Sequence, residues 1–460
     1  MDERLSDDLA RLPQLLAQTG DYAAELLSGL EERPVAVPPA PRAGRALPAE
    51  GKGLAGALEE FRQHWEPGFS GSAGPRYLGF VTGGATPAAL AGDWLTAALD
   101  QNPVSGLDSA APDLEREVIG WLRELFGLSE AHSGAFVSGA TASNMVGLAI
   151  AREWLGEQAG VEVSEAGAGA LGPVAVLSGT PHSSVYKALS ILGLGRNALQ
   201  PVPTLPGREA VDVTALEEAL AALRGRPAIV VANAGTVNTG DFDDLRAIAA
   251  LRERHPFWLH VDAAFGAFAA LSPSHAHLVE GLDEADSVCV DLHKWGNVPY
   301  DSAVQFTHRR DLQIRVFRNS AAYLGRPTET PDLIHLTPEN SRRLRALAAW
   351  FSLTAYGRDG HREIVERNMA TARALGDRLS ADPRWRLLAP VRLNVVCFTV
   401  ADDPAPGRID RIVKTVASGG DLFVTPTVLN GTPALRAAFS NWRTTPGHLD
   451  RIVGALNAAL

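Results

Sequence analysis

The sequence predicts an α/β fold with an open, mainly parallel sheet, followed by a smaller α+β domain. Two observations support this. Between about Pro112 and His308, short apolar runs of strand length alternate with longer stretches of helical spacing, which is typical of a parallel sheet covered by helices. From about residue 340 the chain has two amphipathic helical stretches, two apolar runs and a last helical stretch. A site is expected at the carboxyl ends of the parallel strands.

The first 75 residues are expected to form a helical arm. Leucines recur at helical spacing through residues 5–30, and a second helical stretch covers about Leu54–His64. The segment Arg33–Pro48 between them is rich in Pro, Ala, Gly and Arg, which is typical of an extended linker. We expect residues 1–75 to pack against a second subunit.

Residues 76–338 are expected to form the larger domain and residues 339–460 the smaller one. Acidic residues at Asp241, Asp243 and Asp244 mark the start of one helix. In the larger domain the expected strands are 135–137, 174–177, 228–232, 257–261 and 287–291, and the expected helices are 141–155, 183–192 and 243–254. In the smaller domain we expect strands at 395–400 and about 435–439 and a last helix at 446–459.

Composition and charge narrow the class of protein. A hydrophobic content of 46% and a charged content of 21% over 460 residues are ordinary for a globular protein with an ample core. The net charge of −11 argues against nucleic acid or an anionic membrane as the main partner. The two cysteines, Cys289 and Cys397, lie in apolar runs. They predict a reducing compartment and no set of metal ligands.

The N-terminal residues do not have the pattern of a targeting segment. The first thirty are acidic and lack the basic-then-apolar order of a signal peptide. No apolar stretch reaches about 18 residues, so no membrane span is expected. The expected location is the cytoplasm.

Lys294 follows the apolar run Ser287–Val290 and lies between His293 and Trp295. A lysine in such surroundings is poorly hydrated, and burial disfavours its ammonium form, as a Schiff-base lysine requires. Thirty-two positions earlier (294 − 262), Asp262 ends another apolar run. A carboxylate and a lysine at the ends of two successive strands fit the two poles of pyridoxal phosphate (PLP). Asp262 would pair with the pyridine nitrogen, and Lys294 would bind the aldehyde carbon.

Three further features lie at the ends of predicted strands. The small residues of Gly139–Asn144 would let a phosphate approach the amides of a helix N-terminus. The imidazole of His182 would lie flat against the pyridine ring, with Ala264 closing the other face. The polar loop Gly235–Gly240 is suited to hydrogen-bonding a ligand. Each feature alone also fits a helix cap or a turn. Because all of them fall at the ends of successive predicted strands, together they favour one site.

With these motifs the chain resembles the PLP-dependent group II amino acid decarboxylases, which include aromatic-L-amino-acid and glutamate decarboxylases. The resemblance covers about residues 64–457. Its motifs are Gly-Ala-Thr-Ala-Ser-Asn at 139–144, His-Ser-Ser-Val at 182–185, His-Val-Asp-Ala-Ala at 260–264 and His-Lys-Trp at 293–295. Residues 75–80 also look like the substrate-side strand of the family. The resemblance implies PLP-dependent transferase fold type I, as in aspartate aminotransferase, and an obligate homodimer with active sites at the interface.

The resemblance also implies roles for single residues. Lys294 would be the Schiff-base lysine, Asp262 would hold the pyridine nitrogen, and His182 would stack on the ring. Further cofactor contacts are expected from Thr141, Ala142, Ser143, Thr236, Asn238, Ala264 and His293. The polar loop departs from the aromatic enzymes at its middle position, where Val237 replaces a hydroxyl-bearing residue.

Two positions bear on the reaction. Tyr323 lies 29 residues after Lys294 (323 − 294), the spacing found in the aromatic decarboxylases. There the tyrosine is linked to protonation of Cα, whereas aldehyde-forming relatives have phenylalanine. The segment Asn319–Leu324 looks like the mobile catalytic loop of the family. Arg436 matches an arginine implicated in holding the substrate carboxylate in glutamate-type members.

The resemblance therefore implies decarboxylation of an L-amino acid to its amine and CO₂. Phe80 suits an apolar pocket, and the tyrosine spacing slightly favours an aromatic substrate. Asn102 and Arg436 would instead suit an acidic or polar substrate, such as glutamate or 2,4-diaminobutyrate. The motifs also fit an aldehyde-forming, lyase or aminotransferase reaction, a catalytically silent homologue, and a PLP-binding regulator. A regulator would normally carry a basic helix-turn-helix segment, which residues 1–75 do not resemble.

Overall fold

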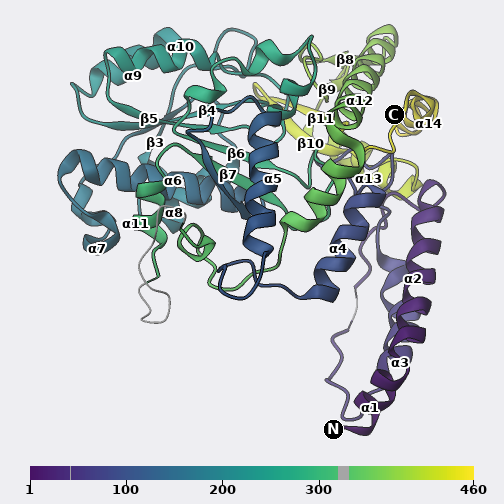
Figure 1. Ribbon diagram of the computed structural model, residues 1–460. Helices are drawn as coiled ribbons and strands as arrows, with labels where there is room; N and C mark the ends of the chain where they lie inside the picture. The colour runs from purple at the N-terminus through teal and green to yellow at the C-terminus, as the bar shows by residue number, and fades with distance from the viewer. Residues whose placement is uncertain (42, 320–330) are drawn as a thin grey trace.

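The computed structural model describes residues 1–41, 43–319 and 331–460. Its main feature is a seven-stranded sheet of order β1-β7-β6-β5-β4-β2-β3 (Figure 1). The strands are β1 (Ser133–Val137), β2 (Val176–Ser178), β3 (Leu199–Pro201), β4 (Ala228–Asn233), β5 (Phe257–Asp262), β6 (Ser287–Asp291) and β7 (Ala303–Thr307). β7 pairs antiparallel with β1 and β6, and the other neighbouring strands run parallel. The predicted α/β class is confirmed.

Both faces of this sheet are covered, which explains why its central strands are continuous apolar runs. Every residue of β4, β5 and β6 is buried. Alternate residues of β4 enter two different cores, with Val230 facing one and Val231 the other. The helices of the first core are α5 (Ala111–Leu125), α9 (Val213–Ala222), α10 (Leu245–Ala250) and part of α12 (Ala346–Ala381). Those of the second are α6 (Ala140–Ala159), α8 (Ser183–Ile191) and α11 (Arg310–Phe317), and the short α7 (Val163–Ala166) follows α6.

A second, antiparallel sheet of order β10-β11-β9-β8 has its own core, as the predicted α+β domain requires. Its strands are β8 (Trp385–Leu387), β9 (Val395–Val400), β10 (Thr425–Leu429) and β11 (Thr432–Ala438), and its helices are α13 (Pro406–Gly419), α14 (Leu449–Ala458) and the C-terminal part of α12. Gly357 interrupts α12 with a φ of 58°. Leu78 also packs in this core, because its amide donates to Phe423 and its carbonyl accepts from Ala438.

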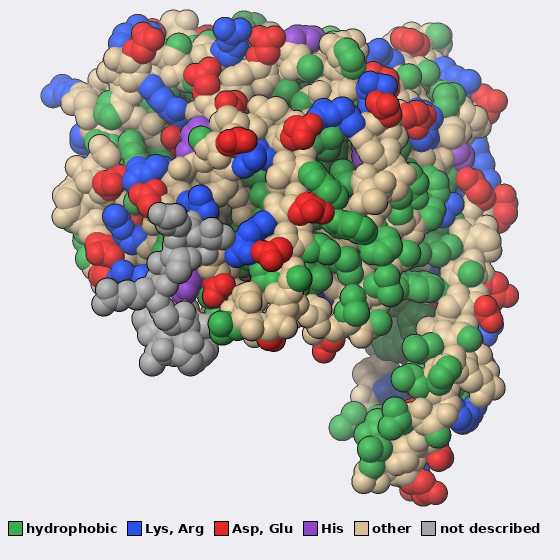
Figure 2. Space-filling view, viewed as in Figure 1, with side chains coloured by type: hydrophobic (Ala, Val, Ile, Leu, Met, Phe, Trp, Pro, Cys, Tyr) green, Lys and Arg blue, Asp and Glu red, His purple; other side chains and the backbone are tan. Residues whose placement is uncertain are grey.

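The N-terminal arm consists of α1 (Glu3–Ala10), α2 (Leu12–Ser28) and α3 (Gly53–His64), and it projects from the body of the molecule (Figure 1). The predicted helices are confirmed. The next helix, α4 (Pro87–Leu99), packs along α12. Figure 2 shows hydrophobic side chains gathered on this side of the molecule. The large hydrophobic side chains that helices α1–α4 expose are Leu5, Leu9, Leu12, Leu16, Trp94, Leu95 and Leu99. Across the described ranges, the helices are too short or too polar to cross a membrane.

Candidate active site

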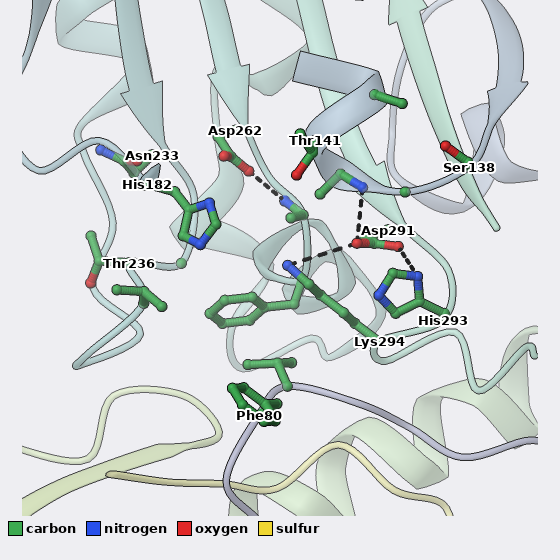
Figure 3. A pocket seen from close by; sticks show the side chains of 18 of the residues that line it. Phe80, Ser138, Thr141, His182, Asn233, Thr236, Asp262, Asp291, His293 and Lys294 are labelled. Carbon is green, nitrogen blue, oxygen red and sulfur yellow. Dashed lines mark hydrogen bonds and ion pairs between the residues drawn. The ribbon is translucent and has the colours of Figure 1, made fainter. Parts of the chain in front are cut away.

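A cavity of about 500 Å³ lies at the carboxyl ends of β4, β5 and β6, where the sequence predicts a site (Figure 3). It is lined by residues that follow these strands, by the start of α6 and by the segment around Phe80. Arg436 of β11 lines it from the smaller sheet. The cavity thus joins segments that are far apart in the sequence.

Lys294 lies in the turn after β6, with its side chain directed into the cavity (Figure 3). Its side chain is 19% exposed, its Nζ lies 3.9 Å from Asp291 Oδ2, and its ammonium lies 5.7 Å from the centre of the Phe265 ring. The turn is held from the N-terminal side, since the Gly83 amide donates to the His293 carbonyl. A Cβ on Gly83 would lie 2.0 Å from the Lys294 carbonyl oxygen, so only glycine fits this approach.

Asp291 ends β6 and organises the residues around the lysine. Its Oδ2 accepts the amide of Ala140 at the start of α6, and its Oδ1 lies 2.8 Å from His293 Nδ1. The His293 ring also packs against the Tyr300 ring, with ring centres 4.3 Å apart. One buried carboxylate therefore links the lysine, the histidine beside it and the helix start.

Asp262 ends β5 and faces the cavity with a carboxylate that is itself firmly held. Its Oδ2 accepts a hydrogen bond from Asn144 Nδ2 at 2.8 Å, and its Oδ1 accepts the Ala264 amide at 3.2 Å. Because a carboxylate can only accept here, the Asn144 amide nitrogen must face Asp262, and its Oδ1 must face His260 Nε2 at 2.9 Å. His260 Nε2 is therefore a donor.

The hydrogen bonds continue from His260 to Ser287 and Trp258, and from Asn144 to Ser184, and the donor of each one is determined. Burial lowers the pKa of His260 to about 4, so its ring is neutral near pH 7 and its Nδ1 accepts from Ser287 Oγ at 2.7 Å. That hydroxyl in turn accepts from Trp258 Nε1, a group that can only donate. Asn144 Nδ2 also donates to Ser184 Oγ. Each group in this series therefore donates its hydrogen bond toward the cavity, from Trp258 in the interior of the sheet to Asp262.

His182 forms the N-cap of α8, with its Nδ1 accepting the Ser184 amide at 3.2 Å. The hydroxyl of Ser184 lies 2.8 Å from the same nitrogen. Burial lowers the pKa of His182 below its usual range, opposed by the nearby Asp262 carboxylate. With Nδ1 an acceptor, Nε2 carries the proton. A neutral ring therefore lines the cavity beside Asp262 and Lys294 (Figure 3).

The start of α6 offers backbone amides to the cavity. Thr141 and Ala142 line it, and Thr141 is exposed. A Cβ built on Gly139 would meet the His293 ring at 3.6 Å, so little fills the space beside the helix start. Ser143 is buried, and its hydroxyl donates to the Val304 carbonyl. The anion-binding features are thus the first-turn amides and the Thr141 hydroxyl.

The polar loop is held by Glu209, which sequence reasoning missed. This buried carboxylate accepts hydrogen bonds from Thr236 Oγ1, Asn238 Nδ2 and both the amide and hydroxyl of Thr239, at 2.6–3.0 Å. Thr236 lines the cavity. Asn238 faces the smaller sheet instead, where its Oδ1 accepts from Thr427.

Arg436 and Phe80 lie at the mouth of the cavity. Arg436 is 7% exposed, and it donates to the carbonyls of Val237 at 2.8 Å and Gly79 at 2.9 Å. Its Nε is buried and has no hydrogen-bond partner among the described residues. Burial lowers its pKa. Phe80 is 53% exposed and packs against Phe423.

The structure brings most of the predicted residues together. Those that line the cavity are Phe80, Thr141, Ala142, His182, Thr236, Asp262, Ala264, His293, Lys294 and Arg436. In the described part of the chain, Asn102, Ser143 and Asn238 do not line it. The Oδ1 of Asn102 accepts the Arg342 amide. Tyr323 lies outside the described residues.

Several lining residues were not predicted. Asp291 is the last residue of β6 and Asn233 the last of β4, as Asp262 is the last of β5. A polar residue at the end of an apolar run could therefore have identified both. Tyr300 and Ser138 lie in loops without such a pattern, and only the fold places them.

The donor set fits PLP. A lysine amine, a carboxylate fixed at both oxygens with further lone pairs, a neutral histidine and the open start of α6 share one cavity. Lys294 would hold the aldehyde end, Asp262 the pyridine nitrogen, and the start of α6 the phosphate. The arrangement suits chemistry at the Cα of an amino acid bound beside Lys294.

Comparison with known proteins agrees with this arrangement. The family model described as the pyridoxal-dependent decarboxylase conserved domain matches residues 41–401. Among similar curated proteins, an aromatic-L-amino-acid decarboxylase of Bacillus atrophaeus is 27% identical, covering 84% of this chain and 81% of its own. An L-2,4-diaminobutyrate decarboxylase of Rhizobium meliloti is 30% identical, covering 89% and 83%. A crystal structure of Oryza sativa TDC with PLP and tryptamine superposes with a TM-score of 0.90 at 23% identity, covering 98% of each chain.

Proposed function

Because this chain belongs to the family of pyridoxal-dependent decarboxylases, lyases that remove CO₂ from amino acids with PLP, we propose that it converts an aromatic L-amino acid to the corresponding amine. One observation carries the proposal. Lys294, Asp262 and His182 line one cavity whose lining also includes the apolar side chains of Phe80, Val81 and Phe265. The first three suit the cofactor, and the apolar part of the lining suits an aromatic side chain.

The roles of the chain's own residues follow from their contacts. Lys294 would anchor the cofactor and yield its place to the amine of the substrate. Asp262, held by Asn144 and the Ala264 amide, would keep a proton on the pyridine nitrogen. His182, whose Nδ1 accepts the Ser184 amide so that the ring is neutral, would pack on the ring of the cofactor without competing for that proton. When bound, PLP supplies the sink for the electron pair released as CO₂ leaves.

Arg436 is proposed to orient the substrate carboxylate. It lies in the cavity wall with a buried Nε that lacks a partner in the described residues. The attraction between a carboxylate and a buried cation is stronger than the same attraction in water, because the local dielectric constant is low. Holding this group out of the plane of the ring would select loss of CO₂ over loss of a proton.

Tyr323 is proposed to return a proton to Cα, on the family resemblance and its 29-residue spacing from Lys294. Tyr323→Phe should abolish amine formation and release aldehyde and ammonia with consumption of oxygen. Amine, aldehyde and oxygen can be measured on the same sample. Unchanged amine formation would remove Tyr323 from the mechanism.

The substrate class is tested by a panel of amino acids. Purified holoenzyme is incubated with the twenty amino acids, dopa, 2,4-diaminobutyrate and cysteine sulfinate, and CO₂ and amine are measured. We expect an aromatic amino acid to give the highest kcat/KM. A preference for glutamate or 2,4-diaminobutyrate would favour the second candidate function, decarboxylation of an acidic or polar amino acid. The Arg436 guanidinium in the cavity wall suits the side-chain carboxylate of glutamate. A product formed without CO₂ and with a keto-acid acceptor would indicate transamination.

Cofactor attachment has its own test. The purified protein should be yellow, and Lys294→Ala should abolish the absorption band of the bound cofactor or convert it to that of free cofactor. A colourless protein that takes up no added PLP would contradict the assignment of Lys294.

We also propose a homodimer with its active sites at the interface. The arm and α4 expose seven large apolar side chains, and Figure 2 shows hydrophobic side chains gathered over this part of the molecule. Contiguous apolar patches of this kind are typical of protein–protein interfaces. At the cavity mouth Phe80 and Tyr300 are also largely exposed. A second copy would cover both regions. We also propose the division into an arm (1–75), a larger domain (76–338) and a smaller domain (339–460) that the sequence predicts.

A cytoplasmic location is the remaining proposal. Cys289 and Cys397 are both free and buried, and burial raises the pKa of each thiol. Such cysteines are typical of a reducing compartment. Fractionation of cells that express the protein would test the location.

A further inference from the structure

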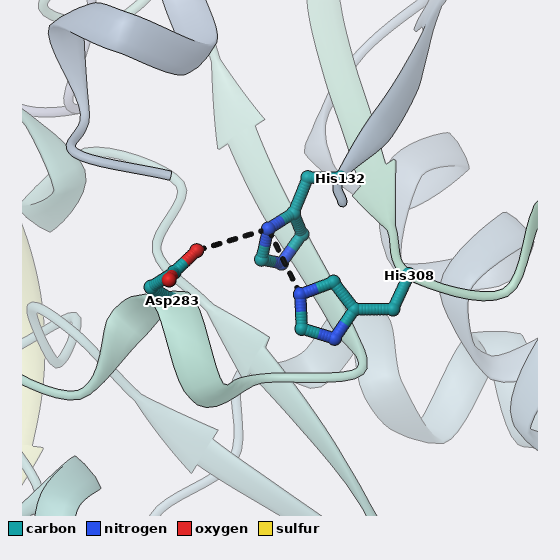
Figure 4. A group of neighbouring side chains, drawn as sticks. All are labelled: His132, Asp283 and His308. Atoms are coloured by element: carbon teal, nitrogen blue, oxygen red, sulfur yellow. Dashed lines mark hydrogen bonds and ion pairs between the residues drawn. The ribbon is translucent and has the colours of Figure 1, made fainter. Parts of the chain in front are cut away.

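Two histidines and an aspartate meet at the opposite edge of the large sheet from Lys294 (Figure 4). His132 immediately precedes β1, His308 immediately follows β7, and Asp283 lies in the turn before β6. Because β6 runs from this edge to the cavity, the length of a strand separates the two places. The cluster is therefore independent of the candidate active site.

The three side chains are spaced like metal ligands. His132 Nδ1 lies 3.0 Å from His308 Nε2 and 3.2 Å from Asp283 Oδ1. All three ligand atoms lie within 4.8 Å of one another. In a tetrahedral zinc site with Zn–N distances of about 2.0–2.1 Å, neighbouring ligand atoms are about 3.3 Å apart. The two distances from His132 Nδ1 are close to this value.

The tautomer of His132 leaves a lone pair at the centre of the cluster. His132 Nε2 lies 3.1 Å from the Ala285 carbonyl, which can only accept, so Nε2 carries the proton. When the His132 ring is neutral, its Nδ1 is an acceptor that faces a carboxylate oxygen of Asp283, which is also an acceptor. His308 can donate a single N–H toward these two acceptors. A cation between the three atoms would satisfy all of them at once.

The surroundings of the cluster are those of metal ligands. A ligating histidine normally donates its second N–H to a carbonyl or carboxylate, as His132 does to Ala285. A ligating carboxylate is normally hydrogen-bonded as well, and Asp283 Oδ1 accepts the Ser129 amide at 2.6 Å. His132 is fully buried, whereas the Asp283 side chain is 46% exposed. One side of the cluster is thus open to a water molecule.

We propose that His132, Asp283 and His308 bind a divalent transition-metal ion, with water as the fourth ligand. Two imidazole nitrogens and one carboxylate oxygen suit Zn²⁺ best among the ions that cells supply in quantity. The ion would join the starts of β1 and β6 to the end of β7. Its effect is therefore on the stability of this sheet edge and not on decarboxylation.

The test uses tag-free holoenzyme treated with a chelator and then dialysed against Zn²⁺. Bound metal is measured by mass spectrometry, affinity by competition with a chromophoric chelator, and stability by thermal denaturation. We expect one Zn²⁺ per chain and a higher Tm with Zn²⁺. Asp283→Asn and His308→Gln should each weaken binding about tenfold or more. Glu284→Gln, which removes an exposed carboxylate from the same turn, should leave affinity unchanged.

Co²⁺ gives a second readout on the unmodified chain, because Co²⁺ in a tetrahedral site has visible absorption bands at longer wavelengths than bound PLP. These bands should appear in the wild type and in Glu284→Gln. The proposal is overturned if the wild type binds no Zn²⁺. It is also overturned if both ligand variants, folded by circular dichroism, bind Zn²⁺ as tightly as the wild type.

Discussion

Asn144 is the residue on which the polar interior of the site depends. Its amide group is fully used, donating to Asp262 and Ser184 and accepting from His260. Each of these partners is buried. The orientation of the Asn144 amide therefore determines that His260 carries its proton on Nε2.

Replacing Asn144 with leucine should damage the site more than the fold. The substitution preserves volume but leaves the Asp262 carboxylate without one of its donors, at a cost of roughly 1–3 kcal/mol. We expect the Kd for PLP to rise, or kcat to fall, by about ten- to a hundredfold. Cofactor titration by absorbance and steady-state kinetics would measure both.

Asn394→Leu is the matched control, because Asn394 is also a buried asparagine but donates to the Phe439 carbonyl in the smaller sheet. It should lower Tm while leaving the Kd for PLP close to that of the wild type. Equal losses of cofactor affinity in both variants would show that the Asn144 network has no special role.

At the scale of elements, the apolar strands that end at the site were predictable, whereas β7 and β3 were not. The predicted strands 257–261 and 287–291 match β5 and β6 to within a residue. Their continuous apolar runs are a direct consequence of burial on both faces. β7 was missed because its sequence includes Gln305 and Thr307, which are buried but hydrogen-bonded. The short β3 includes Gln200 and ends in proline, so it lacks an apolar run.

The same distinction applies to the site. Asp262 and Lys294 could be predicted because Asp262 follows an apolar run directly and Lys294 lies four residues after the end of another, at Val290. Glu209 and Tyr300 could not, because tertiary contacts alone bring them to the polar loop and to the His293 ring. Asn102 was expected near the substrate from its polarity, but its side chain accepts a backbone amide in this chain.

The arm offers a prediction at this scale. If α1 and α2 pack against a second copy, Leu9→Glu combined with Leu16→Glu should weaken the dimer about a hundredfold or more, because burying each leucine contributes roughly 1.5–3 kcal/mol. Sedimentation equilibrium would measure the dissociation constant.

Ile191→Glu is the control for this experiment. Ile191 is 61% exposed at the end of α8, and Figure 1 places α8 across the molecule from the arm. This variant should dimerise like the wild type. A dimer unaffected by the two arm substitutions would show that the arm has another role.

For the whole molecule, His260 links stability to pH. Burial holds its pKa at about 4, whereas an unfolded chain has a histidine pKa near 6.5. Between these pH values the unfolded state binds a proton that the folded state does not. The free energy of unfolding should therefore fall as pH decreases from 6.5 to 4, by about 3 kcal/mol from this residue.

Denaturant unfolding at several pH values would test this contribution. His260→Gln, which cannot be protonated, should flatten the pH dependence in that window even if it lowers stability overall. His277→Gln, which replaces an exposed histidine, should keep the wild-type slope. A slope unchanged in His260→Gln would mean that other groups produce the acid sensitivity.

The bonds of Arg436 also determine how the molecule can move. Arg436 binds the Val237 and Gly79 carbonyls, and Thr427 donates to Asn238. These hydrogen bonds tie the smaller sheet to the polar loop, which belongs to the larger domain, and to the segment before Phe80. A hinge motion of the smaller sheet relative to Lys294 would have to break them. Substrate analogues of different length should therefore leave the angle between the two domains unchanged, which small-angle X-ray scattering can measure.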